Sequence, residues 1–187
     1  MQLTNILISS FFSVATLGFY SLVQKILGMP SALIGSSIGQ VFFQEASEAK
    51  KKDGNALNVY KRTIKKLLII GIFGFGILFF LIEDIFTFVF GEKWRVAGEY
   101  AQIVIPFFLV RFIFASTSSI YDIFNALKIE LIWQIVLVIG IILILFIFKD
   151  SGFKTFLTYM TIYGVLMYSL SLYITFQLSK GIYKYGK

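Results

Sequence analysis

Long runs of apolar residues dominate this chain, and they limit what it can fold into. A helix that crosses a bilayer needs about 20 mostly apolar residues. Five stretches meet this need, at 17–43, 67–90, 100–124, 131–148 and 156–178, and a shorter one lies at 3–17. None alternates between apolar and polar residues as the strands of a membrane barrel do. The sequence therefore predicts an all-α integral membrane protein, with five full transmembrane helices and a partial one at the N-terminus.

The composition agrees with a membrane location and excludes several kinds of site. Of the 187 residues, 58% are hydrophobic and 14% are charged, whereas soluble chains carry about 25% charged residues. Without cysteine or histidine, the chain has no thiolate or imidazole for catalysis, haem binding or a zinc site. The phosphate-binding motif of P-loop ATPases is also absent. We therefore predict no catalytic residue, no cofactor and no metal site, and we expect a protein that is not an enzyme.

The basic residues predict how the chain is oriented in the membrane. Cytoplasmic loops of membrane proteins carry an excess of Lys and Arg. Eleven of the 17 basic residues fall on one side of the predicted spans and four on the other. The eleven are seven residues of the polar segment 44–66 together with Lys128, Lys180, Lys184 and Lys187. We predict one multi-pass transmembrane domain over residues 1–187, with a basic cytoplasmic loop at 44–66 and a cytoplasmic C-terminus. The charge of +7 then reflects topology, and no nucleic-acid partner is expected.

Arg111 lies within a predicted span, where a charge is costly unless it faces a cavity or a partner. Ser118 and Asp122 follow it by seven and eleven residues, a spacing that places all three on one helical face. We predict that this face lines a hydrated cavity in which Arg111 meets an anionic headgroup, because a guanidinium can engage two phosphate oxygens at once. The alternative is an internal Arg–Asp or Arg–carbonyl contact that fixes packing.

Lys25 and Pro30 both interrupt the span at 17–43. Lys25 is a second candidate for a phosphate contact, and snorkelling of its side chain toward the interface is an equal alternative. Pro30 removes a helical hydrogen bond and predicts a kink, which a transporter would use for gating. Gly35 and Gly39 are at least as well explained by close packing of helices. Close packing is also expected for Gly71, Gly74 and Gly76 in the next span.

Two stretches resemble motifs of a transporter family. They are GFYSLVQKILGMPSALIGSSIGQVFFQEASE at 18–48 and FVFGEKWRVAGEYAQIVIPFFLVRFI at 88–113. Both are similar to segments in the C-terminal half of Wzx-like polysaccharide or O-antigen flippases, with Lys25 where an Arg is common. These flippases belong to the multidrug/oligosaccharidyl-lipid/polysaccharide exporter superfamily. The resemblance implies that the chain forms one half of a two-lobed helical bundle.

The resemblance also implies a function. Wzx-like flippases carry undecaprenyl-diphosphate-linked glycans across the bacterial cytoplasmic (inner) membrane by alternating access. Lys25 and Arg111 would then lie on cavity-lining helices and contact the diphosphate or acidic sugars. Membrane lipid and the N-terminal half of the transporter are the other implied partners, and we expect no transport by this chain alone. Half of a drug exporter, a non-transporting assembly subunit and a gene remnant remain alternatives.

Overall fold

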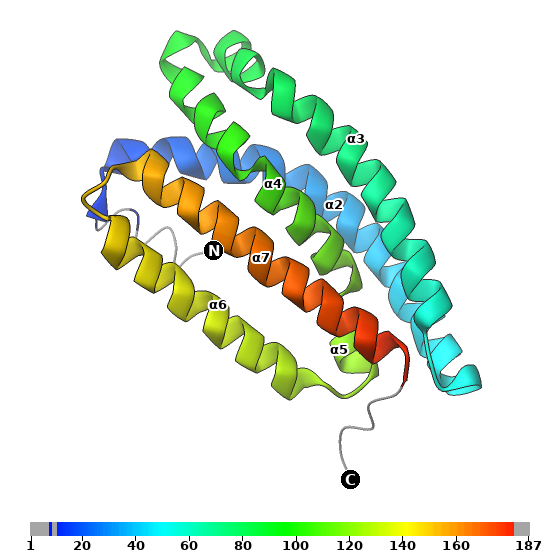
Figure 1. Ribbon diagram of the computed structural model, residues 1–187. Helices are drawn as coiled ribbons and strands as arrows, with labels where there is room; N and C mark the ends of the chain where they lie inside the picture. The colour runs from blue at the N-terminus through cyan, green and yellow to red at the C-terminus, as the bar shows by residue number, and fades with distance from the viewer. Residues whose placement is uncertain (1–7, 9–10, 182–187) are drawn as a thin grey trace.

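The computed structural model describes Ile8 and residues 11–181, and its regular elements are helices (Figure 1). The five long ones are α2 (Val14–Asp53), α3 (Leu57–Phe90), α4 (Arg95–Thr117), α6 (Leu127–Phe148) and α7 (Phe153–Ser179). A 3₁₀ helix, Glu92–Trp94, precedes α4, and the short helix α5, Ile120–Ile123, follows it. Five helical segments are long and apolar enough to cross a membrane, which confirms the predicted all-α class and its five spans. Of the partial span expected at 3–17, residues 3–7, 9 and 10 lie outside the described residues.

Helix α4 forms the centre of the bundle and packs against α2, α3 and α7 (Figure 1). Its residues Ala97, Ala101, Val104 and Phe108 are buried. Helix α6 lies on the outside and packs mainly against α7. Most of the apolar side chains of α6 are therefore exposed, and lipid chains would surround them in a membrane.

Local signals explain where the helices begin and end. The Ser13 hydroxyl accepts a hydrogen bond from the Thr16 N–H at 3.1 Å and so caps the first turn of α2. Helix α2 ends at Gly54, whose φ of 71° is left-handed and favours glycine. Gly152, with a φ of 86°, makes the turn between α6 and α7. These positions allow long helices to follow one another after short connections.

The basic segment 44–66, predicted as a cytoplasmic loop between spans, is helical except at residues 54–56. Helix α2 continues to Asp53 and α3 begins at Leu57. The sequence EASEAKKKD contains strong helix formers and no Gly or Pro, so nothing in it ends the helix. The 40 residues of α2 span roughly 60 Å, about twice the hydrocarbon core of a bilayer. The C-terminal end of α2 and the N-terminal end of α3 thus form a basic helical hairpin that extends beyond the hydrocarbon core of a bilayer.

Polar side chains attach two helices to α7. The Tyr60 hydroxyl on α3 donates a hydrogen bond to the Leu172 carbonyl at 2.9 Å. On α6, Trp133 Nε1 donates to the Met167 carbonyl at 2.8 Å. Between helices surrounded by lipid the hydrophobic effect gives little attraction, so such bonds and close packing contribute much of the association energy.

Glycines allow some of these helices to approach closely. A β-carbon added at Gly98 of α4 would lie 2.7 Å from the Cα of Glu83 on α3. One added at Gly71 would lie 2.6 Å from the Leu109 side chain, in line with its expected role in packing. At Gly74 and Gly76 an added β-carbon would meet nothing within 4 Å among the described residues. Within this part of the chain, no close approach of two helices depends on these last two glycines, contrary to the expectation.

Candidate functional site

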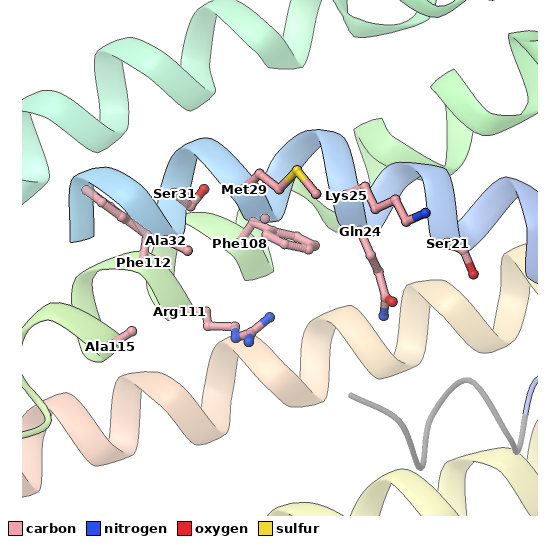
Figure 2. Close-up of a pocket in the computed structure, with 11 residues that line it drawn as sticks. Ser21, Gln24, Lys25, Met29, Ser31, Ala32, Phe108, Arg111, Phe112 and Ala115 are labelled. Carbon is pink, nitrogen blue, oxygen red and sulfur yellow. The ribbon is translucent and has the colours of Figure 1, made fainter. Parts of the chain in front are cut away.

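A cavity of about 590 Å³ lies between α2 and α4 and is lined by both cations that the sequence placed within spans. Lys25 projects from α2 and Arg111 from α4 (Figure 2). The other lining residues are Ser21, Gln24, Gly28, Met29, Ser31, Ala32, Phe108, Phe112 and Ala115. Two charged residues that are distant in the sequence thus line one hollow, together with hydroxyl and amide groups.

Arg111 is supported by aromatic side chains from three helices. Its guanidinium carbon lies 6.0 Å from the ring centre of Phe107 and 5.9 Å from that of Phe108, within the range of cation–π attraction. Its charge also interacts with the hydroxyl groups of Tyr20 on α2 and Tyr168 on α7. Such contacts reduce the cost of holding a cation at membrane depth.

A second, smaller cavity of about 170 Å³ lies among α2, α4, α6 and α7. Arg111 and Gln24 line both this cavity and the larger one. The Arg111 side chain extends toward Gln24 in Figure 2. Arg111 therefore lies at the boundary between the open hollow and a smaller, mostly apolar cavity that Tyr20 and Tyr168 also line.

The larger cavity continues along α2 as two adjoining cavities. One, of about 540 Å³, shares Ala115 with it and contains Ser118. The next, of about 300 Å³, shares Phe43 with the second and contains Asp122 beside Lys50. We refer to the three cavities together as the α2 groove.

The residues predicted to share one helical face with Arg111 line the same groove at different places. Helix α4 ends at Thr117, so the straight face expected to continue through Ser118 to Asp122 is interrupted. Asp122 belongs to α5 and lies at the end of the groove near Lys50. The structure therefore separates Asp122 from Arg111 instead of placing the two in one cavity.

Pro30 lies inside α2, which curves along its length in Figure 1. It lines a mostly apolar cavity of about 130 Å³ between α2, α3 and α4, outside the α2 groove. The neighbouring Ser31 hydroxyl donates a hydrogen bond to the Leu27 carbonyl. The kink and the gating role of Pro30 stay predictions.

Sequence reasoning missed most of the stripe of α2 that faces the groove. Its members recur every three or four residues along the helix. They are Ser21, Lys25, Met29, Ala32, Ser36, Gln40, Gln44, Ser47 and Lys51. Polar residues at a period near 3.6 within an apolar span were the available signal. Of this stripe the sequence identified only Lys25, and it did so from the charge within a span.

The groove supplies binding groups of two kinds. Lysine and arginine contribute positive charge, while serine and glutamine contribute hydrogen-bond donors and acceptors. Over the part of the chain that the structure describes, no three Asp, Glu, His or Cys side chains gather where they could hold a metal ion. The arrangement is therefore suited to bind an anionic group next to uncharged polar groups.

The comparison with protein families assigns the chain to one of them. Residues 1–99, more than half of the 187, match the family described as polysaccharide biosynthesis protein. The match includes all of α2 and α3, and with them Lys25 and one wall of the α2 groove. No curated protein and no solved structure matches the chain. Because of this match, the chain belongs to the polysaccharide biosynthesis protein family, and its five apolar helices make it a multi-pass membrane protein.

Proposed function

We propose that the chain takes part in moving lipid-linked glycan precursors across the bacterial cytoplasmic membrane, as part of a Wzx-like flippase. The family match and the five membrane helices support this proposal. The observation that carries it is the cavity of about 590 Å³ lined by Lys25 and Arg111. Two cations beside one hollow among membrane helices form a binding place for an anionic group.

The diphosphate of an undecaprenyl-diphosphate-linked glycan fits this place chemically. It carries several anionic oxygens, and it joins a lipid chain to a sugar. The planar Arg111 guanidinium can bind two phosphate oxygens, and the Lys25 ammonium adds a mobile positive charge. The lipid chain would remain in the bilayer, while the headgroup moves through the α2 groove.

Alternating access would open the groove to each side of the membrane in turn. In this proposal the basic hairpin of α2 and α3 and the C-terminus face the cytoplasm, as the distribution of Lys and Arg favours. The headgroup would enter near Lys50 and Lys51 and advance toward Arg111. An N-terminal lobe of the transporter would face the groove as the partner, and membrane lipid would cover α6.

Binding of farnesyl diphosphate, a short lipid diphosphate, tests the proposal. The purified chain would be placed in lipid nanodiscs and titrated with radiolabelled probe. We expect Arg111→Ala to weaken binding by about 10- to 100-fold, the equivalent of about 1.5–3 kcal/mol for hydrogen bonds to a charged group. Arg111→Lys keeps the charge but loses the bidentate geometry, so it should fall between Arg111→Ala and the unchanged chain.

Lys128→Ala is the matched control, because Lys128 is an exposed cation at the start of α6, outside the groove. It should bind the probe as the unchanged chain does. Equal binding by Arg111→Ala and Lys128→Ala would refute the proposal. Tight binding of a cationic drug that does not depend on Arg111 would instead favour a drug exporter. Flipping of a labelled lipid diphosphate in proteoliposomes then tests whether this chain transports without a partner.

A further inference from the structure

The middle cavity of the α2 groove differs from its neighbours because none of the described residues that line it is charged. Its volume is about 540 Å³. Its lining consists of small, amide and hydroxyl residues and one aromatic ring: Gly35, Ser36, Gly39, Gln40, Phe43, Gln44, Ala115, Ser116, Ser118 and Ser119. On either side of it the groove contains cations, Lys25 with Arg111 at one end and Lys50 with Lys51 at the other. The groove thus alternates between charged and uncharged polar sections.

Glutamines and serines face this cavity from two sides. Ser36, Gln40 and Gln44 follow one another at intervals of four residues on α2 and are exposed, so they share one face of that helix. Ser118 and Ser119 come from the end of α4 on the opposite side. Each glutamine amide has two donor hydrogens and an acceptor oxygen. The cavity therefore offers donors and acceptors together, without a net charge.

One of these groups lacks a hydrogen-bond partner within the described residues. The Ser119 hydroxyl oxygen is buried and makes no hydrogen bond there. Buried polar groups in native proteins are nearly always satisfied. Because Ser119 lines the cavity, a turn of its side chain would let this hydroxyl bond to a polar occupant. Phe43, 49% exposed, adds an apolar ring on which the C–H face of a sugar can pack.

We propose that the middle cavity of the α2 groove binds the first sugar of the lipid-linked glycan, the one attached directly to the diphosphate. This inference rests on the proposed function. The sugar would be an uncharged, hydroxyl-rich ring, held by amide and hydroxyl groups that can both donate and accept. An anion or a cation would find no opposite charge among the residues that line this cavity.

The position of the cavity agrees with the covalent structure of such a substrate. The first sugar is bonded to the diphosphate, so its binding place must adjoin the phosphate site. Ala115 lines both cavities, and it follows Arg111 by four residues, roughly 6 Å along a helix. The same substrate can thus place its phosphates beside Arg111 and its sugar beside Ser118.

Two probes separate the sugar contact from the phosphate contact. One is farnesyl diphosphate, and the other is farnesyl diphosphate that carries a single N-acetylglucosamine. We expect the unchanged chain in nanodiscs to bind the sugar-bearing probe more tightly by about 5- to 50-fold, as two or three uncharged hydrogen bonds would give. The double substitution Gln40→Ala and Gln44→Ala should remove most of this difference. It should change the affinity for farnesyl diphosphate less than twofold.

Gln134→Ala is the control, since Gln134 is an exposed amide on α6 that does not line the groove. It should keep the full preference for the sugar-bearing probe. The inference is overturned if the unchanged chain binds both probes equally, or if the double variant keeps the preference. A different result would refute the proposed function itself: Arg111→Ala would then bind both probes as tightly as the unchanged chain does. Near-equal thermal unfolding temperatures of the variants confirm that each is folded.

Discussion

The contact between Gly98 and Glu83 determines how closely α4 approaches α3, and Gly98→Ala should disturb it. An added β-carbon would lie 2.7 Å from the Cα of Glu83, about 1 Å closer than two carbon atoms normally pack. A flexible side chain could turn away, but Cα belongs to the backbone of α3. The two helices would therefore have to separate, and the buried contacts of Ala97 and Ala101 beside Gly98 would loosen.

The expected change in the free energy of unfolding is a difference between two opposing effects. Overpacking of this kind costs about 1–3 kcal/mol, while replacing a helical glycine by alanine returns about 1 kcal/mol of helix propensity. Because the clash is with backbone, the upper part of the first range applies. We expect a net destabilisation of about 1–2 kcal/mol, which lowers Tm by about 2–8 °C for a chain of this size.

Gly74→Ala is the matched control on α3. A β-carbon there meets nothing within 4 Å among the residues that the structure describes, so only the gain in helix propensity remains and stability should rise slightly. Thermal unfolding in detergent, followed by tryptophan fluorescence, measures both variants. Trp94, whose ring centre lies 5.2 Å from that of Phe19, is next to the start of α4 and reports on this region. A Gly98→Ala variant as stable as Gly74→Ala would refute the reasoning.

Three further predictions test the packing and the topology. Tyr60→Phe removes a bond between α3 and α7 and should lower the free energy of unfolding by about 0.5–1.5 kcal/mol, whereas Tyr159→Phe at an exposed site should not. Trp133→Phe removes the hydrogen bond that attaches α6 to α7 and should speed amide hydrogen exchange in α6. Unchanged exchange would contradict a role of this bond in holding α6. In a chain without cysteine, Lys52→Cys should react with an impermeant maleimide only from the cytoplasm and Lys93→Cys only from outside. The reverse pattern would invert the orientation.

Apolar composition predicted where the membrane spans lie better than where the helices end. The predicted spans 67–90 and 131–148 end at the same residues as α3 and α6, because a turn with glycine or charged residues follows each. At their N-terminal ends both helices extend beyond the predicted spans, and α3 begins ten residues before its span, at Leu57. Polarity shows where lipid contact stops. A helix stops only where the backbone hydrogen bonds are interrupted, which the segment EASEAKKKD does not do.

Charge at membrane depth identified Lys25 and Arg111 from the sequence, but it could not show that they line one cavity. That depends on how α2 packs against α4. A β-carbon at Gly35 would lie 3.0 Å from the Ser116 Oγ, and one at Gly39 would lie 3.4 Å from the Ser116 carbonyl oxygen, so these two glycines allow the helices to approach closely. Close packing was one of the two explanations that the sequence left open for these glycines, and these distances agree with it, but the sequence could not name the partner helix.

Helices α2 and α6 leave similar shares of their surface exposed, yet the exposed groups differ. Only 17% of the spanning window of α2 and 11% of that of α6 are buried. Exposed residues of α6 such as Ile132 and Ile139 are apolar, and lipid can cover them without loss of hydrogen bonds. Lys25 and Gln40 on α2 are exposed as well, but lipid would leave the Lys25 ammonium and the Gln40 amide without the hydrogen bonds that water gives them. The polar stripe of α2 must therefore face water or another polar surface, which supports a hydrated groove independently of the family match.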